Sequence, residues 1–470
     1  MDTYQSLLNM VKGKHCAILG LGVSNLPLVR LLLALDSQIS LTIYDKKSPE
    51  ELGSEALALI NDRVNFICGA NCFDNIEGEV IFRSPGIRPD IKGIREALQK
   101  GAILTSEMEA FLHLSPALTF GITGSDGKTT STTLCGKFLE GSARVFVGGN
   151  IGTPLLDKAS GMCESDRVVL ELSSFQLMTL KDAPCCSAIT NISPNHMDWH
   201  TSLEEYAESK YNIIGKNTRR VVLNADSEKT LELGKRLLER GNKEIIFFSS
   251  SKTPNDIPPG AKLIYLLDGI IYFYDNFGSV PLLDSSRILL PGKHNIENYM
   301  TAMALTYGYV DTKIYEQVAQ SFKGVEHRLE LVRKLNGVDY YNSSIDSSPT
   351  RTAAALSALS GRDIVAICGG YDKNLSYKPL AESLCSSVRA VVLTGDTAKK
   401  INYAILECSD YNPEKLTVVQ SSSFEDALLK AHNLARKGGC VILTPACASF
   451  DRFKNFDQRG KYFKELVSKL

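Results

Sequence analysis

The chain has 470 residues, of which 44% are hydrophobic and 22% charged, with a formal net charge of −1. This length suits about three domains of ~150 residues, and the balanced charge excludes the strongly basic surface of a nucleic-acid-binding protein. The longest apolar runs are too short for a membrane span, and the N-terminus lacks a secretory signal pattern. We therefore expect a cytoplasmic protein with no membrane span, whose 12 scattered cysteines stay reduced.

Short apolar segments that predict strands alternate with helical segments along the whole chain, which indicates parallel α/β sheets. They form three series, separated near residues 105 and 325. A hairpin over 263–274, turning at Asp268-Gly269, adds a small antiparallel element to the second series. The predicted domains are residues 1–105, 106–324 and 325–470.

In the first series, a strand over 15–20 leads into Gly20-Leu21-Gly22 and a helix, and Asp45 ends the next strand. The pattern resembles a dinucleotide-binding fingerprint, but Asn25 occupies the third glycine position, which disfavours a nicotinamide cofactor. Two interpretations stay open. The segment is a tight strand-to-helix turn, or its backbone N–H groups bind a nucleotide diphosphate while Asp45 accepts from a sugar or base.

The second series opens with GITGSDGKTT at 121–130. The strict P-loop pattern fails by one position, because Ile122 stands five residues before Gly127. The groups that phosphate binding needs are still present. The glycines let backbone amides surround phosphates, Lys128 neutralises the β/γ oxygens, and Thr129 can reach Mg²⁺. A nucleoside triphosphate site is therefore predicted. Its residues are Gly124, Ser125, Asp126, Gly127, Lys128, Thr129 and Thr130.

Polar side chains follow the next two strands of this series. Glu171 ends an apolar strand that we expect beside the P-loop strand, where a carboxylate can organise Mg²⁺. The segment 191–200 places His196 and His200 beyond the following strand, at the edge where ligands collect. Spacing alone leaves His196 undecided and favours a bystander role for His200.

Six segments together resemble the signature series of the Mur ligases, ATP-dependent enzymes that build the peptide stem of bacterial cell-wall precursors. The resemblance implies a Rossmann-like N-terminal domain for a UDP-sugar, a central ATPase domain and a Rossmann-like C-terminal domain for an amino acid. The segments are GITGSDGKTTSTT, GGNIG (148–152), ELSSFQL (171–177), NISPNHMDWH (191–200), GKHNIEN (292–298) and EHRLE (326–330).

The closing stretch, 444–460, resembles the family member that joins D-glutamate to UDP-N-acetylmuramoyl-L-alanine. The implied chemistry begins when ATP phosphorylates the alanyl carboxylate. The amino-acid nitrogen then attacks the acyl phosphate, and a tetrahedral intermediate collapses to amide and phosphate. The implied partners are these three small molecules, with the enzyme acting as a monomer.

The resemblance also assigns roles to single residues. It implies that Lys128 and Thr129 bind the ATP phosphates and a first Mg²⁺ with Glu171, and that His196 binds a second Mg²⁺. It implies a carbamylated Lys210 whose carbamate oxygen helps to hold the metal, since a bare ammonium would repel it. Further implied contacts are Asn150 and Gln176 to substrate; Asn295, Asn298 and Arg328 to ATP; and Val23, Ser24, Asp45, Ser84, Pro85 and Gly86 to the uridine diphosphate.

For the incoming glutamate, the resemblance implies contacts from Ser449, Phe456 and Lys373. The segment 341–352 departs from the familiar form, Asn-Asp-Ser-Lys-Ala-Thr-Asn: Ser343 replaces its aspartate and Ile345 its lysine. Isoleucine cannot neutralise a carboxylate, and a dicarboxylate in a partly dry site needs cationic partners.

Either the acceptor is not glutamate, or its charge is met from elsewhere. We favour the second interpretation, with Arg351 as a bidentate partner near a helix start. A surface position for Arg351 is the competing interpretation.

Three other functions compete with this one. A nucleotide-driven switch would form no amide product, and a dehydrogenase would bind a nicotinamide cofactor. A sibling Mur ligase or a folylpolyglutamate-type ligase would use another amino acid. The amino acid that drives phosphate release distinguishes such a ligase from one that uses D-glutamate.

Overall fold

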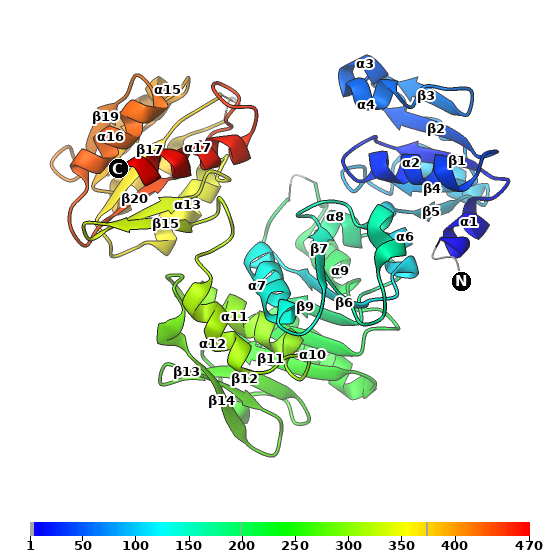
Figure 1. Ribbon diagram of the computed structural model, residues 1–470, viewed down its shortest axis with the longest axis horizontal. Coiled ribbons are helices and arrows are strands. Elements are labelled where there is room, and N and C mark those ends of the chain that lie inside the picture. The colour runs from blue at the N-terminus through cyan, green and yellow to red at the C-terminus, as the bar shows by residue number, and fades with distance from the viewer. Residues whose placement is uncertain (1–3, 198, 373–374) are drawn as a thin grey trace. The chain divides into compact units, whose positions relative to one another are not determined.

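The computed structural model describes residues 4–197, 199–372 and 375–470. The described residues contain three sheets with helices between their strands (Figure 1). The chain folds into two compact units, Met1–Arg287 with Ile296–Val318, and Ile288–Asn295 with Ala319–Leu470. The first two sheets belong to the first unit and the third sheet to the second. The boundaries predicted near 105 and 325 stay predictions.

The first sheet is wholly parallel, in the order β3-β2-β1-β4-β5. Strand β1 lies between β2 and β4, so the loops after β1 and β4 meet where the strand order reverses, the usual ligand position in such sheets. The strands are β1 (His15–Leu19), β2 (Ser40–Asp45), β3 (Val64–Cys68), β4 (Val80–Arg83) and β5 (Ile103–Thr105); the helices are α1 (Gln5–Val11), α2 (Asn25–Leu35), α3 (Pro49–Leu52), α4 (Ser54–Leu57) and α5 (Lys92–Gln99).

The second sheet has nine strands in the order β14-β13-β12-β11-β10-β9-β6-β8-β7. Its strands are β6 (Leu118–Thr123), β7 (Val145–Gly149), β8 (Arg167–Glu171), β9 (Cys186–Ile189), β10 (Arg220–Asn224), β11 (Glu244–Ser249), β12 (Lys262–Leu267), β13 (Ile270–Tyr274) and β14 (Ser279–Asp284). The α-helices are α6 (Glu107–Leu114), α7 (Lys128–Glu140), α8 (Ser174–Leu177), α9 (Leu203–Tyr211), α10 (Glu228–Arg240), α11 (Lys293–Thr306) and α12 (Lys313–Ser321). Three short 3₁₀ helices are η1 (Leu156–Gly161), η2 (Pro254–Asp256) and η3 (Ser285–Arg287).

The predicted hairpin is present, and it continues the parallel sheet. Strand β12 pairs in parallel with β11 and antiparallel with β13, and the turn residues Asp268 and Gly269 both have positive φ. Strand β14, which our sequence analysis did not predict, extends this edge further. Its residues are mostly exposed and include Pro281, so it lacks the apolar run that marked the other strands.

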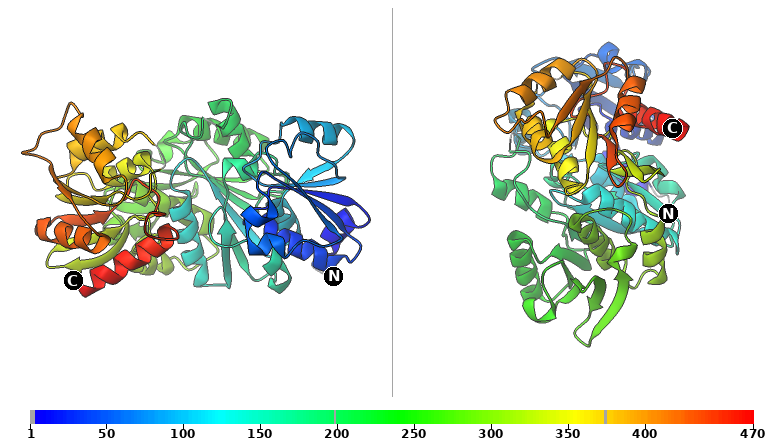
Figure 2. Two further views of the ribbon diagram at one scale, coloured as in Figure 1. Left: turned by 90° about the horizontal axis from the view of Figure 1, so that it is seen from above. Right: turned by 90° about the vertical axis from the view of Figure 1, so that its left-hand side faces the viewer.

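The third sheet, in the order β15-β16-β20-β17-β18-β19, is covered by helices on both faces (Figure 2). Along β17, Ile364, Ala366 and Cys368 pack into one apolar cluster and Val365 and Ile367 into the other. This alternation makes β17 a continuous apolar run, typical of a strand in a parallel sheet that is buried on both faces. The elements are β15 (Glu330–Leu335), β16 (Val338–Asn342), β17 (Ile364–Cys368), β18 (Ala390–Leu393), β19 (Thr417–Gln420), β20 (Cys440–Leu443), α13 (Pro349–Ala358), α14 (Lys378–Ser387), α15 (Ala398–Leu406), α16 (Phe424–Leu434) and α17 (Phe456–Lys469).

The predicted α/β fold with parallel-dominated sheets is confirmed. A second strand absent from the prediction, β15, pairs antiparallel with β16 at the edge of the third sheet. All 12 cysteines are free. Within the described part of the chain, no helix is long and apolar enough to cross a membrane.

Candidate active site

The P-loop joins β6 to α7, as the sequence predicts. Gly127 has φ 79°, and a Cβ added there would lie 2.3 Å from Asn298 Oδ1. Gly124 has φ 146°, and its Cβ would lie 1.8 Å from Thr190 Oγ1. Both positions therefore require glycine, because no side chain fits and the left-handed backbone favours it. The result is a loop whose backbone can approach a phosphate closely.

Hydrogen bonds to the end of β9 hold the P-loop in place. The Ser125 hydroxyl donates to Ser193 O at 2.9 Å, and the Asp126 N–H donates to Asn191 Oδ1 at 3.0 Å. The Lys128 ammonium donates to the carbonyl oxygens of Gly124 (2.9 Å) and Ser125 (2.8 Å), so it lies over the loop. This is where a positive charge can meet phosphate oxygens.

Glu171 lies beside the P-loop, because β8 pairs with β6 and places Glu171 opposite Ile122. The side chain is buried, and its Oε1 accepts a hydrogen bond from Asn150 Nδ2 at 2.8 Å. The second oxygen, Oε2, is buried without a hydrogen-bond partner among the described residues. A buried, unpaired carboxylate oxygen is unfavourable unless a cation or donor meets it, so this position fits a hard cation such as Mg²⁺.

The described residues contain no cluster of three or more His, Cys, Asp or Glu side chains able to hold a metal ion. A Mg²⁺ site needs no such cluster, because the ion usually binds one or two protein carboxylates together with substrate phosphates and water. Thr129, at the second position of α7, is buried beside the loop. Thr129 and Glu171 are thus the side chains that would hold a Mg²⁺ bound with ATP.

Lys210, in α9, is 1% exposed. Its ammonium donates to Gly124 O at 2.9 Å and lies 4.5 Å from the centre of the Tyr206 ring. Burial, together with the nearby Lys128 charge, lowers the pKa of Lys210 well below its ordinary value. The predicted carbamylation site therefore lies against the P-loop.

His196 and His200 occupy different surroundings. His196 is exposed with φ 55°, and its ring contacts that of Phe175 at 5.0 Å. His200 is buried, with Nε2 hydrogen-bonded to Ser174 Oγ at 3.0 Å. Burial lowers the pKa of His200, so the ring stays neutral as part of the packing. These surroundings favour a bystander role for His200, whereas His196 is accessible to a ligand.

The remaining predicted ATP and substrate contacts lie in both units. Asn298, on α11, lies next to Gly127 and accepts from Ser131 Oγ at 3.3 Å. Gln176 is the N3 residue of α8, and its Oε1 caps the helix start, leaving the amide nitrogen as the end that can donate to a ligand. Asn295 and Arg328 belong to the second unit, where Asn295 Nδ2 donates to Pro291 O at 2.6 Å.

The predicted uridine diphosphate site lies at the loops after β1 and β4. Asp45 accepts from the Leu21 N–H at 2.8 Å, so its carboxylate holds the glycine loop, and two oxygens leave capacity for a ligand. Asn25, at the third glycine position, donates to Gly20 O at 2.8 Å and closes the turn. Val23 is 78% exposed at the start of α2. Ser84, Pro85 and Gly86 follow β4 across the reversal point.

The predicted amino-acid residues of the second unit gather at one edge of the third sheet. The segments after β16, β20 and β17 leave adjacent parallel strands at their carboxyl ends. Arg351 is exposed in the first turn of α13, whose N-cap is Ser348. Ser449 is buried after β20, and Phe456, 40% exposed, begins α17. Lys373 lies outside the described residues.

Two buried charged residues at this edge were missed by our sequence analysis. Arg459, on α17, donates to Ser344 O at 2.8 Å and Cys447 O at 3.1 Å, which ties the loop after β16 to the loop after β20. Burial lowers the pKa of Arg459 to about 10. Asp346 accepts from Thr444 Oγ1 at 3.1 Å, and burial raises its pKa to about 6. Asp346 was signalled by a lone carboxylate in the hydroxyl-rich segment 343–350, whereas Arg459 lies among other charged residues and gave no such signal.

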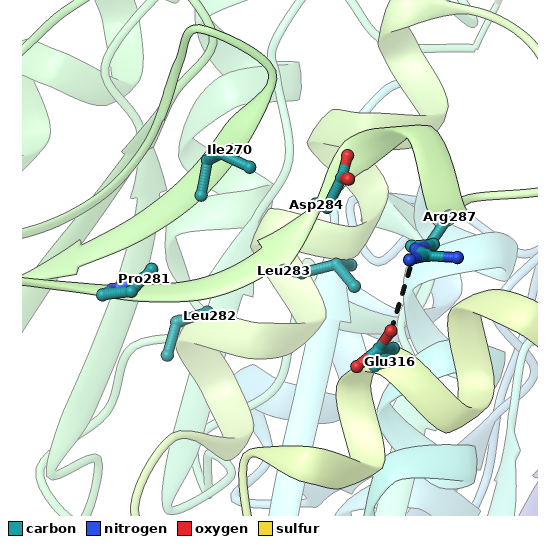
Figure 3. Close-up of a pocket in the computed structure, with 7 residues that line it drawn as sticks. All are labelled: Ile270, Pro281, Leu282, Leu283, Asp284, Arg287 and Glu316. Carbon is teal, nitrogen blue, oxygen red and sulfur yellow. Dashed lines mark ion pairs between the residues drawn. The ribbon is translucent and has the colours of Figure 1, made fainter.

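A pocket of about 270 Å³ lies away from these residues, between β14 and α12 (Figure 3). Arg287 and Glu316 form an ion pair at its rim, with Nε and Oε1 3.8 Å apart. Its lining offers no phosphate-binding loop and no nucleophile, so we assign it no catalytic role. The lining residues are Ile270, Pro281, Leu282, Leu283, Asp284, Arg287 and Glu316.

Comparison with known proteins covers most of the chain. Residues 122–306 match the Mur ligase middle domain, and residues 327–447 match the Mur ligase glutamate ligase domain. A relative from Ruminiclostridium cellulolyticum, named UDP-N-acetylmuramoylalanine–D-glutamate ligase, is 44% identical over 467 residues, which cover 98% of this chain and 97% of that protein. The chain belongs to the Mur ligase family.

Other Mur ligases agree with this assignment. A relative of the same name from Acetivibrio thermocellus is 40% identical over 466 residues, 98% of this chain and 97% of its own. The crystal structure of UDP-N-acetylmuramate–alanine ligase MurC from Thermotoga maritima aligns with a TM-score of 0.52 at 17% identity, covering 97% of this chain and 99% of that one. At that identity the structural match shows the Mur ligase fold alone.

Proposed function

We propose that this Mur ligase adds D-glutamate to UDP-N-acetylmuramoyl-L-alanine with hydrolysis of ATP, a step in peptidoglycan precursor synthesis. The observation that carries the proposal is the full-length similarity to proteins named for this reaction, up to 44% identical. The geometry of the P-loop supports it independently, since Lys128 and the unpaired Glu171 oxygen lie where a triphosphate and its cation would bind.

The reaction needs an activated carboxylate. A carboxylate is a poor acyl donor, and transfer of the γ-phosphoryl group from ATP forms a C–O–P linkage with release of ADP. The glutamate nitrogen then bonds to the carbonyl carbon, the C–O bond to phosphate breaks, and the amine loses a proton. Phosphoryl transfer requires positioning and charge neutralisation above all.

This chain's residues supply those requirements. Lys128 offsets the negative charge that develops on the transferring phosphoryl oxygens, and the P-loop backbone orients the triphosphate. Thr129 and Glu171 would hold one Mg²⁺, and His196 a second; when bound, the metal neutralises phosphate charge. We propose two Mg²⁺ sites, and we include the other nucleotide contacts and a carbamylated Lys210.

The acceptor is proposed to bind at the carboxyl edge of the third sheet. Arg351 meets one glutamate carboxylate in place of the lysine that Ile345 replaces, with Ser449 and Phe456 nearby on the adjacent segments. Ser347, Ser348 and Thr350 add hydroxyl donors at the start of α13. We also propose that the enzyme acts as a monomer in the cytoplasm, where ATP and UDP-activated sugars are available.

The test is an ATP-dependent phosphate release assay from which each component is omitted in turn. We expect release only when Mg²⁺, ATP, UDP-N-acetylmuramoyl-L-alanine and D-glutamate are all present, with an amide product of the corresponding mass. Phosphate release without an amide product would favour a nucleotide-driven switch. A better acceptor than D-glutamate would leave the ligase chemistry in place and remove the D-glutamate assignment.

A further inference from the structure

Two arginines at the end of β4 connect the first sheet's ligand loop to the second sheet. Arg83 is 1% exposed, and its guanidinium donates to Pro85 O (3.1 Å) and Ile87 O (2.6 Å) of its own loop. It also donates to Phe175 O (2.8 Å) and Thr179 Oγ1 (3.1 Å), in the segment that follows β8. Burial lowers the pKa of Arg83 to about 10. This side chain holds the loop after β4 against α8.

Arg88, five residues further along, forms the second connection. Its Nη1 donates to Trp199 O at 2.6 Å and to Glu205 Oε2 at 3.2 Å, and its Nη2 donates to Glu205 Oε1 at 2.8 Å. Asp90 receives two further hydrogen bonds, both at 2.9 Å. The guanidinium carbon lies 4.9 Å from the centre of the Trp199 ring. Arg88 thus forms ion pairs through two-pronged hydrogen bonds and also stacks its planar guanidinium on the Trp199 ring, a combination that lysine cannot reproduce.

The partner carboxylate is itself fixed in the loop that carries His196. Glu205 Oε2 accepts from the Thr201 N–H at 2.8 Å and faces His200 Nδ1 at 3.3 Å. The Arg88 hydrogen bond leads the interactions that lower the pKa of Glu205 to about 2. The lowered pKa keeps the Glu205 carboxylate ionised at neutral pH, so it can pair with the Arg88 guanidinium there.

A series of ring contacts leads from the Arg88–Glu205 ion pair to His196, the proposed metal ligand. The Trp199 ring packs on Phe175 at 4.5 Å, and Phe175 packs on His196 at 5.0 Å. The backbone N–H groups of Trp199 and His200 both donate to His196 O, at 3.1 and 2.9 Å. The turn that aims His196 is therefore built from the residues that Arg88 holds.

We propose that Arg88 is a positioning residue that couples ligand binding at residues 84–86 to the orientation of the His196 loop. Residues 84–86 and Arg88 belong to the loop after β4, so a ligand bound at residues 84–86 stabilises the conformation in which Arg88 contacts Trp199 and Glu205. The loop that carries His196 is then in position when the UDP-sugar is bound. This inference rests on the proposed function, since it takes the UDP-sugar as the ligand of the first sheet.

The chain contains its own reporter for this coupling, because Trp199 is its single tryptophan. The test follows Trp199 emission during titration with UDP-N-acetylmuramoyl-L-alanine in the presence of Mg²⁺, with calorimetry on the same samples. We expect the wild-type emission to change in a saturable manner, with a midpoint that matches the calorimetric one. Arg88→Ala should bind the UDP-sugar within about threefold of the wild-type affinity and show no ligand-dependent emission change.

Kinetics provide the second readout. Arg88→Ala should lower kcat by about tenfold or more, as expected for a displaced catalytic group, while the KM for the UDP-sugar changes by less than about threefold. Arg88→Lys should recover only part of the loss. Arg30→Ala is the matched control, since Arg30 lies in the same sheet's helix α2 and forms an exposed ion pair with Glu55; its kcat should equal that of the wild type.

Glu205→Gln tests the same coupling from the other partner. The double variant with Arg88→Ala should lose no more activity than the worse single variant, because both changes break one interaction. Independent losses that multiply would overturn the proposal. So would wild-type binding without an emission change, or an Arg88→Ala enzyme that keeps both the emission change and kcat. Absence of an amide product with the wild-type enzyme would remove the proposed function itself, and this inference with it.

Discussion

The P-loop and the edge of the third sheet are both proposed to hold negatively charged ligands, and they are built in different ways. At the P-loop, consecutive residues supply the backbone amides, the lysine and the hydroxyl, and Lys128 contacts the loop itself. At the edge of the third sheet, buried Arg459 joins two segments that are distant in sequence, the loops after β16 and β20, and Arg351 stands exposed on a helix. The proposed phosphate site is thus encoded by consecutive residues, whereas the proposed acceptor site is assembled from separate loops.

The largest effect should come from the local site. Lys128→Ala should lower ATP-dependent phosphate release by about a thousandfold, because the variant loses the charge that offsets the negative charge of the transferring phosphoryl group. Removal of Mg²⁺ with a chelator should abolish release in the wild type. Lys137→Ala, on the exposed face of the same helix, is the control and should be fully active. Full phosphate release by the Lys128→Ala enzyme would remove the site assignment.

Lys210→Arg should reduce activity by about a hundredfold although the formal charge is kept. A neutral amine can add to CO₂, with loss of a proton to solvent, to give a carbamate anion; a guanidinium cannot. Carbon-13 NMR with labelled bicarbonate should show one carbamate signal in the wild type and none in the variant. Exposed Lys216→Arg serves as the control and should keep both signal and activity. Well-resolved density for an unmodified Lys210 in an active, Mg²⁺-loaded crystal would contradict the idea.

The contrast between a site built from consecutive residues and a site assembled from separate segments explains how much could be predicted from the sequence. The pairing of the Glu171 strand with the P-loop strand was predicted from short motifs and apolar runs whose meaning is local. Strands β14 and β15 were missed because edge strands are half exposed and lack such runs. Arg459 was missed because its partners are backbone carbonyl groups from remote segments, which no residue pattern announces.

At the assembled site, Arg351→Ala should raise the KM for D-glutamate by about tenfold, the loss of one charge-assisted contact. The KM for ATP should change by less than about twofold. D-glutamate should support phosphate release, whereas L-lysine, diaminopimelate and L-glutamate should not. Arg436→Ala, an exposed change in the same unit, is the control. An unchanged KM for D-glutamate would place Arg351 on the surface with no role in binding.

The smallest effect concerns stability at the same edge. Burial raises the pKa of Asp346 from 3.8 to about 6, so between these values the folded chain keeps a proton that the unfolded chain has lost. Stability therefore falls as pH rises through this window, and the destabilisation is complete above pH ~6. Asp346→Asn should raise the free energy of unfolding by about 2 kcal/mol at pH 7, with the gain disappearing near pH 4.

Thermal unfolding at both pH values measures the effect of Asp346→Asn. Exposed Asp410→Asn is the control and should shift Tm equally little at each pH. A gain from Asp346→Asn that is the same at both pH values would mean that ionisation of Asp346 is not its source.

Strand β14, the outer strand of the nine-stranded sheet, affects how readily copies of this protein aggregate at high concentration. An uncovered strand offers unpaired N–H and C=O groups to any other extended chain. Pro281, within β14, has no N–H to offer, and the pairing of β13 with β14 slips in register at Ile271/Tyr272. Proline and irregular pairing both make an edge a poor template for a further strand. Pro281 and the irregular pairing of β13 with β14 therefore make this margin of the sheet a poor template for a strand from another copy, and this margin lies away from the P-loop strand β6.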